Sequence, residues 1–177
     1  YGQLGARFAK WRAVITIGEV IPTDYCIRTN AHALARYAAL SQEAGLVPIV
    51  EPEVLMDADN TIETCYDVTL RTLQRVFSEL AEQRVALEGM LLKPNMVISG
   101  KQCPVQADAA RIAELTLECF RETVPAAMPG IVFLSGGQSD EEATENLNAI
   151  NSHGAQPWVL SFSYGRALQA PALKAWA

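Results

Sequence analysis

The sequence is poor in cations, with 14 Lys and Arg residues against 20 Asp and Glu residues in a chain of 177. The net charge of −6, with no local Lys/Arg cluster, is the opposite of the broad basic surface that nucleic acids require. Long apolar runs are missing too, because the longest nearly uncharged stretches, such as 158–165, fall far short of the roughly 20 residues that cross a bilayer. We therefore expect neither a nucleic acid nor a membrane as a partner.

Paired metal ligands and redox motifs are also lacking. No C-x-x-C, H-E-x-x-H, G-x-G-x-x-G or P-loop pattern occurs. The four cysteines lie far apart in the sequence: Cys26, Cys65, Cys103 and Cys119. Such cysteines are typical of reduced thiols in a cytoplasmic protein. His32 lies in an expected helix and His153 in an expected loop, and both are interpreted as structural. We predict no metal and no other cofactor.

The sequence does contain short apolar runs that alternate with segments of helical periodicity. The apolar runs are short and rich in β-branched residues, which predicts buried strands at 8–17, 47–51, 90–93, 131–134 and 158–162. Helical periodicity is clearest over about 61–84 and recurs around Ile27 and Ile112. Ser139-Asp140-Glu141-Glu142 is a capping box, which predicts a helix that ends near Asn151. Five strand–helix units predict an α/β protein.

The predicted strands are continuously apolar, so we expect both of their faces to be covered. Polar residues lie at or near the carboxyl end of every strand, which favours a TIM (β/α)8 barrel, whose strands all contribute to one mouth. No linker divides the units, so residues 1–177 are predicted to form a single domain. A complete barrel takes about 250 residues. Because the chain begins with Tyr1 and ends in a helix-like stretch, we expect a piece of a longer protein.

Lys93 ends a buried strand and precedes Pro94, so its amine is expected to be partly desolvated. Desolvation disfavours the charged form of an amine, and a second cation nearby, such as Lys10, acts in the same direction. A neutral lysine is a nucleophile toward carbonyl groups. The alternative is a strand-end lysine that extends its ammonium group to solvent.

Two further pairs of charged residues share strand parity. Glu51 and Glu53 leave the same face if 50–54 is extended, and two like charges at that spacing favour protonation of one carboxyl, as acid–base catalysis needs. Lys10 and Arg12 share a face as well and are candidates for binding an anion, while Trp11 points the other way and is expected to pack against a helix. The alternative for the acids is a solvated pair that balances nearby cations.

Two glycine-containing turns follow the last two strands and are candidate phosphate sites. Ser135-Gly136-Gly137 joins a strand to the capped helix, and its backbone amides could hold a phosphate. Ser163, Gly165 and Arg166 follow the next strand, and the guanidinium is suited to bidentate phosphate contacts. Barrels frequently bind phosphate after strands seven and eight, so the chain is predicted to be about five C-terminal βα units of a barrel. Simple chain reversal is the alternative for a lone Gly-Gly turn.

Several of these segments together resemble class I fructose-bisphosphate aldolase. The segments that carry the resemblance are Phe8-Ala9-Lys10-Trp11-Arg12, Val47-Pro48-Ile49-Val50-Glu51-Pro52-Glu53, Leu91-Leu92-Lys93-Pro94-Asn95-Met96, Phe133-Leu134-Ser135-Gly136-Gly137-Gln138-Ser139 and Phe162-Ser163-Tyr164-Gly165-Arg166-Ala167-Leu168. The resemblance implies a metal-independent glycolytic and gluconeogenic lyase that cleaves fructose 1,6-bisphosphate reversibly into dihydroxyacetone phosphate and glyceraldehyde 3-phosphate. It also implies a cytoplasmic homotetramer.

The resemblance assigns roles to the candidate residues. Lys93 matches the lysine that forms the Schiff base, and Glu51 matches the acid/base of carbinolamine formation and dehydration, with Glu53 and Lys10 setting the charge around them. The site of the C1 phosphate matches Ser135, Gly136, Gly137, Ser163, Gly165 and Arg166. Arg12 resembles a residue near the other end of the substrate channel.

Two alternatives remain open from the sequence. One is a Schiff-base aldolase that acts on another phosphorylated sugar. The other is a non-catalytic fragment that serves as an interaction or assembly module, because the family's first three barrel units and its C-terminal tyrosine have no counterpart in this sequence. Five strands alone would also expose two sheet edges, so we expect the isolated chain to fold poorly.

Overall fold

In the computed structural model, which describes all of residues 1–177, five parallel strands form one sheet in chain order. The strands are β1 (Phe8–Ile15), β2 (Val47–Val54), β3 (Leu91–Leu92), β4 (Gly130–Phe133) and β5 (Val159–Phe162). Each strand is followed by a helix: α1 (Asp24–Glu43), α2 (Ile62–Glu82), α3 (Ala109–Thr123), α4 (Asp140–Asn151) and α5 (Arg166–Trp176). The predicted α/β alternation is confirmed, and strands that neighbour each other in chain order are the arrangement of a barrel segment.

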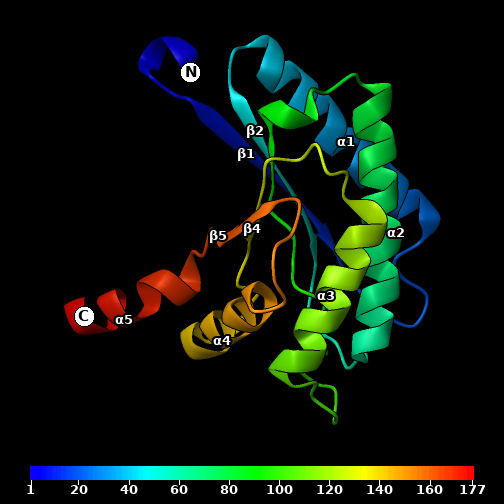
Figure 1. Ribbon diagram of the computed structural model, residues 1–177, viewed down its shortest axis with the longest axis vertical. Helices are drawn as coiled ribbons and strands as arrows, with labels where there is room; N and C mark the ends of the chain where they lie inside the picture. The colour runs from blue at the N-terminus through cyan, green and yellow to red at the C-terminus, as the bar shows by residue number, and fades with distance from the viewer.

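The helices form an outer layer over one face of the sheet. Figure 1 shows α1, α2 and α3 packed together on one side of the strands, with α5 extending away toward the C-terminus. Side-chain caps begin four of the helices, because Thr23, Thr61, Asp108 and Ser139 each accept a hydrogen bond from a first-turn amide. The predicted capping box at Ser139 is present, with Glu142 bonding back to the cap amide. None of the helices combines the length and apolarity needed to traverse a bilayer.

Alternation along the strands separates a core face from an inner face. Val50, Leu92 and Phe133 belong to the buried cluster between the sheet and the helices, and the Phe133 ring stacks on Phe120 of α3 with 5.7 Å between centroids. Successive side chains of a strand point to opposite faces. Residues that flank these core positions, including Glu51 and Lys93, therefore face away from the helices, toward the inside of the barrel segment.

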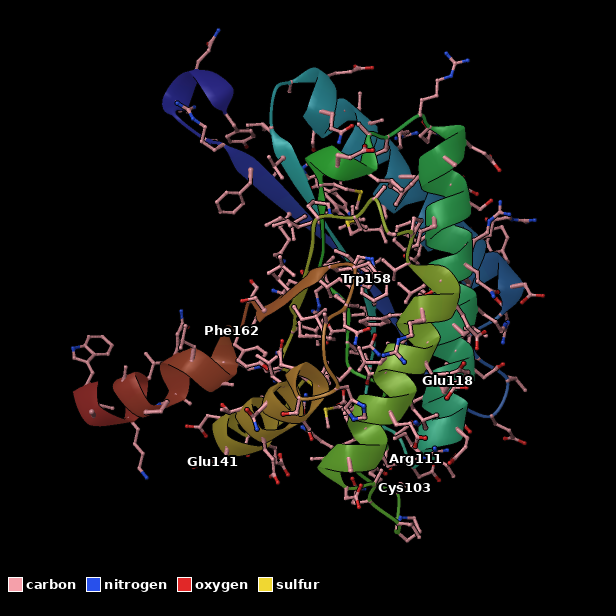
Figure 2. The ribbon with its side chains drawn as sticks, viewed as in Figure 1. Cys103, Arg111, Glu118, Glu141, Trp158 and Phe162 are labelled. Atoms are coloured by element: carbon pink, nitrogen blue, oxygen red, sulfur yellow. The ribbon has the colours of Figure 1, made fainter.

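The expectation that every strand is covered on both faces is wrong for β1 and β5. Each pairs with only one neighbour, so these strands are the edges of an open sheet. Phe8 on β1 is 63% exposed and Phe162 on β5 is 47% exposed. Figure 2 shows Phe162 on the side of β5 that is turned away from α1, α2 and α3, whereas Trp158, which precedes the strand, lies beside α3. Trp158 donates its indole N–H to the carbonyl of Pro125.

Two expected strand positions also differ from the structure. β2 continues past residue 51 to Val54, because it pairs with β1 along its whole length, so the two glutamates lie inside the strand rather than beyond it. Lys10 and Arg12 occupy the middle of β1 instead of its carboxyl end, opposite Ile49 and Glu51 of β2. Their long side chains nevertheless reach farther along the sheet, as described below.

The loop after β3 is held against the loop after β2 by backbone hydrogen bonds. The amides of Gly100, Lys101 and Gln102 donate to the carbonyls of Asn60, Met56 and Ala58, respectively. At Gly100 the two chains approach so closely that a Cβ atom would stand 2.1 Å from the Ala58 carbonyl oxygen. Only glycine fits this contact, so the two loops form one rigid rim at the carboxyl end of the sheet.

A buried carboxylate joins the first two helices. Glu79 of α2 is 3% exposed, and it accepts hydrogen bonds from His32 of α1 and from Arg75 one turn earlier on its own helix. Burial acts to raise the pKa of Glu79, but the hydrogen bonds and charges of His32 and Arg75 outweigh it and lower that pKa below its ordinary value. His32 is thus a structural residue, as interpreted from the sequence.

Replacement of Glu79 by Gln is expected to lower the free energy of unfolding of the full-length protein that carries residues 1–177 by about 1–3 kcal/mol at pH 7. Because the folded-state pKa of Glu79 is lowered, its stabilisation is complete above the ordinary carboxyl value near 4.3 and is lost as the pH falls through the folded-state value. Urea denaturation at pH 7 and below pH 4 measures this effect. Glu82→Gln, at an exposed site on the same helix, is the control, and a Glu79→Gln deficit independent of pH would contradict the linkage.

Residues 1–177 produced alone are expected to self-associate and to lack a cooperative thermal transition. The reason is that β1 and β5 offer unpaired backbone groups next to exposed Phe8, Trp11, Val159 and Phe162. Sedimentation velocity together with thermal circular dichroism would test this. A sharp unfolding transition in a monodisperse monomer would contradict it.

Candidate active site

The charged side chains predicted from the sequence gather on the inner face of three neighbouring strands. Lys10 and Arg12 come from β1, Glu51 and Glu53 from β2, and Lys93 follows β3 directly. The amide of Lys93 donates to the carbonyl of Val50, which continues the β2–β3 ladder and places the lysine beside Glu51. Sheet order alone therefore brings together residues that are up to 83 positions apart in the sequence.

Glu51 is the centre of this cluster. Its carboxylate is 3% exposed and contacts two ammonium groups, with Lys10 Nζ 2.6 Å from Oε2 and Lys93 Nζ 3.2 Å from Oε1. Lys93 itself is 9% exposed, as expected for an amine at the end of a buried strand. An isolated buried carboxylate would be costly, and the ion pairs with the two lysines offset that cost. The same contact puts a proton acceptor within reach of the Lys93 amine.

The two glutamates do not face each other as an isolated pair of like charges. Glu53, which is 4% exposed, forms an ion pair with Arg12 Nε, while Glu51 is shared by the two lysines. Each acid therefore has cationic partners of its own, which the sequence alone did not show. The hydrogen bond to Glu53 raises the pKa of the Arg12 guanidinium further. Trp11, on the opposite face, packs against Tyr37 of α1 as predicted, with 5.9 Å between ring centroids.

The Ser135-Gly136-Gly137 turn lies next to this cluster. The amide of Leu134 donates to the carbonyl of Pro94, so the end of β4 is attached to the residue after Lys93. Gly136 and Gly137 have φ angles of 60° and 86°, a left-handed conformation that favours glycine. Neither glycine amide donates a hydrogen bond within the chain. Successive free N–H groups in such a turn form a concave site for an anion.

The second predicted turn adjoins the first through the β4–β5 pairing. The Ser163 amide donates to the carbonyl of Phe133, and α5 begins at Arg166 after Gly165, without a side-chain cap. Arg166 is exposed, and its Nη2 atom lies 3.9 Å from the point where a Cβ on Gly137 would stand. Tyr164 between them donates its hydroxyl to the carbonyl of Ala143, and burial raises the pKa of Tyr164 to about 12, so this phenol stays neutral.

Three other residues at this end of the sheet were not singled out from the sequence. Asn95, 3% exposed, accepts from the Val54 amide and donates to Thr69, which ties β2 to the chain after Lys93. Gln138 donates to the Ser135 carbonyl and holds the glycine turn. Both belong to segments that carry the family resemblance, but their bonding depends on contacts across the fold. Lys101, which lies beside Gly137, had no local signal at all.

Parallel strands in chain order, with a charged inner face and glycine turns at their carboxyl ends, define a protein of the (β/α)8 barrel class. The sequence identifies the family within this class. Residues 1–177 match the model of the family described as "Glycolytic: Fructose-bisphosphate aldolase class-I". The chain therefore belongs to the class I fructose-bisphosphate aldolase family.

Individual relatives agree with this assignment. The chain is 64% identical to a probable fructose-bisphosphate aldolase class 1 of Xanthomonas campestris pv. campestris, with 99% of this chain and 53% of the relative covered. It is 53% identical to a fructose-bisphosphate aldolase of Dictyostelium discoideum, with 99% and 50% covered. A solved aldolase of Plasmodium falciparum, in complex with TRAP and a small-molecule inhibitor, superposes with a TM-score of 0.97 at 53% identity, over 99% of this chain and 51% of that one.

These comparisons confirm the predicted barrel fold and family. The chain spans about half the length of the curated relatives that it matches. Class I aldolases use a Schiff-base lysine and no metal. The five described strands are thus a barrel segment, which agrees with the prediction of about five βα units.

Replacement of Arg12 by Met is expected to destabilise the full-length protein by about 1–3 kcal/mol, because the buried Glu53 carboxylate loses its cationic partner. A second replacement, Glu53→Gln in the same chain, is expected to restore part of the loss by removing the unpaired charge. A double-mutant cycle in urea measures the coupling. Additive single effects would contradict a direct interaction.

Proposed function

We propose that the full-length protein is a fructose-bisphosphate aldolase that cleaves fructose 1,6-bisphosphate into dihydroxyacetone phosphate and glyceraldehyde 3-phosphate, and catalyses the reverse condensation in glycolysis and gluconeogenesis. The observation that carries the proposal is the position of Lys93, a buried amine whose Nζ lies 3.2 Å from Glu51 Oε1. A nucleophilic amine needs a base within hydrogen-bond distance, and this contact supplies one.

In the first half-reaction, Lys93 acts as the nucleophile. Glu51 takes a proton from the ammonium group, and the nitrogen lone pair attacks the ketone carbon of the substrate. A second proton moves from that nitrogen to the former carbonyl oxygen, which gives a carbinolamine. Glu51 then returns a proton to the carbinolamine hydroxyl, which leaves as water and produces an iminium on Lys93. Lys10 and Arg12 support these steps because their ion pairs with Glu51 and Glu53 balance the charge as the proton moves.

In the second half-reaction, the iminium serves as an electron sink. The hydroxyl on the far carbon of the scissile bond gives its proton to the Glu51 carboxylate and becomes a carbonyl, while the electron pair of the carbon–carbon bond moves toward the iminium and leaves an enamine. The aldehyde product departs. Glu51 returns the proton to the enamine carbon, and addition of water to the regenerated iminium, the reverse of the dehydration, releases dihydroxyacetone phosphate and free Lys93.

The substrate's charge agrees with the distribution of cations. The chain as a whole is acidic, yet three cations and two carboxylates share the inner face, and Arg166 stands at the glycine turns without an acid within 4 Å. We assign the C1 phosphate to the turns that contain Ser135, Gly136, Gly137, Ser163, Gly165 and Arg166. Arg12 is assigned to the other end of the substrate channel.

The names of relatives support a location for the full-length protein, and the family resemblance supports an assembly. Aldolases of Pisum sativum and Arabidopsis thaliana that are 55% identical to this chain are named as cytoplasmic or cytosolic isozymes. We infer the same compartment, and a homotetramer, for the full-length protein. The exposed apolar side chains of β1 and β5 support burial against further protein, within the barrel or between copies.

The two alternatives make different predictions about products and adducts. A Schiff-base aldolase for another phosphorylated sugar would form the same lysine adduct but would release a different aldehyde. An interaction module without activity would form no adduct. Identification of the products therefore separates the two enzymes, and covalent trapping separates an enzyme from a module.

Borohydride reduction in the presence of dihydroxyacetone phosphate is expected to attach the ketose covalently to Lys93 of the full-length protein. The site is located by mass spectrometry of proteolytic peptides. Lys93→Ala is expected to abolish the adduct and to lower kcat by more than about 10³-fold, because Lys93 is the nucleophile of the proposed mechanism and Lys10 is paired with the other oxygen of Glu51. Lys174→Ala, at an exposed position on α5, is the matched control and should react as the wild type does.

The same experiment on residues 1–177 alone determines whether five strands suffice to activate the amine. An adduct elsewhere than Lys93, or none in the full-length protein, would overturn the Schiff-base proposal. Glu51→Gln should retain substrate binding but slow adduct formation, since the amide cannot accept the proton of the ammonium group.

A further inference from the structure

Lys101 is a cation at the rim of the site whose role was not assigned above. It lies in the loop after β3, eight residues beyond Lys93, and its side chain extends to the turn after β4. A Cβ atom on Gly137 would stand 2.7 Å from Lys101 Nζ and 3.3 Å from its Cε. The ammonium group therefore rests against the backbone of the turn, next to the free amides of Gly136 and Gly137.

Lys101 and Arg166 form a pair of cations with no acid between them. Both reach within 4 Å of the same point beside Gly137. Neither has a carboxylate within 4 Å, whereas Lys10, Arg12 and Lys93 are all paired. Two like charges brought together at free N–H donors repel each other unless an anion lies between them. The two cations and the free glycine amides thus converge on one point, as they do in an anion-binding site.

The backbone of Lys101 is held in place independently of any ligand. Its amide donates to the Met56 carbonyl over 2.7 Å, and the amides before and after it donate to Asn60 and Ala58. Gln106 donates to the carbonyls of Gly100 and Cys103 and closes the loop from the other side. The loop therefore presents the ammonium group to the turn at little entropic cost to the backbone, because that backbone is already ordered.

We propose that Lys101 is a further substrate-binding residue, which contacts the phosphate held by the Ser135-Gly136-Gly137 turn and sets the preference for phosphorylated over unphosphorylated ketoses. This inference rests on the proposed function and deepens it. Arg166 offers a planar, bidentate donor from α5, while Lys101 offers a compact charge from the loop after β3. A phosphate between them completes the hydrogen bonds of the free glycine amides. The ketone of the same substrate then extends toward Lys93, whose neighbour Pro94 is bonded to the end of β4.

The test uses the full-length protein with Lys101→Met, which removes the charge but keeps the apolar stem, and Lys101→Arg, which keeps the charge. Lys174→Met, on the exposed last turn of α5, is the matched control. Binding of inorganic phosphate is measured by calorimetry, and KM and kcat are measured with fructose 1,6-bisphosphate. Borohydride trapping is carried out with dihydroxyacetone phosphate and with unphosphorylated dihydroxyacetone.

The Met variant is expected to bind phosphate about tenfold more weakly and to raise KM about tenfold, since one charge-assisted contact is lost. Its kcat and its trapping by unphosphorylated dihydroxyacetone should stay at the wild-type level, and Lys101→Arg should restore phosphate binding to within about threefold. A structural role alone would not distinguish the two ketoses.

The possible failures are distinguishable. If the wild type forms the Lys93 adduct but Lys101→Met binds phosphate and bisphosphate as the wild type does, the assignment of Lys101 is overturned and the proposed function stands. If the wild type forms no Lys93 adduct, the proposed function is overturned, and the role of Lys101 in sugar binding is overturned with it. An equal loss of trapping with both ketoses would also contradict a phosphate contact.

Discussion

A carboxylate removed from water must keep cations beside it, and the inner face of this sheet is arranged around that requirement at Glu51. Lys10 from β1 and Lys93 from the end of β3 reach Glu51 from opposite sides, so the pairing links three adjacent strands at once. Glu53 repeats the pattern one step farther along with Arg12. The Lys93 amine is therefore part of the same charge balance that makes a polar barrel interior tolerable.

The order of the strands turns this local balance into a site. Parallel strands in chain order bring their carboxyl ends to one edge, and the ends of β3, β4 and β5 are joined by the bonds from Leu134 to Pro94 and from Ser163 to Phe133. The cations of the inner face are therefore paired with Glu51 and Glu53, whereas Lys101 and Arg166 at the rim have no acidic partner. The substrate that we propose has an anionic end and a carbonyl end, which would match these two regions in order.

Much of the fold could be predicted from the sequence, since buried strands and capped helices are local patterns that residues such as Ser139 and the run around Leu92 display directly. The side-chain parity of Lys10, Arg12, Glu51 and Glu53 was also predictable, because a strand alternates strictly. The partners of these residues could not be predicted in the same way. Glu51 contacts Lys93 because β2 lies between β1 and β3, and that strand order is a property of the whole sheet. The exposure of β1 and β5 depends on where the sheet stops, which an apolar run does not encode.

Two adjacent positions at the rim, Gly100 and Lys101, differ in how well they are expected to tolerate substitution. The glycine cannot change without forcing two loops apart, whereas the next residue, Lys101, is exposed and extends its side chain to the turn at Gly137. Gly100 thus maintains the loop structure, while the adjacent residue, Lys101, is the one proposed to recognise the substrate. If Lys101 binds the substrate phosphate as proposed, a single exchange at position 101 changes the sugar preference while the fold and Lys93 stay as they are, and substrate range can diverge without a loss of stability.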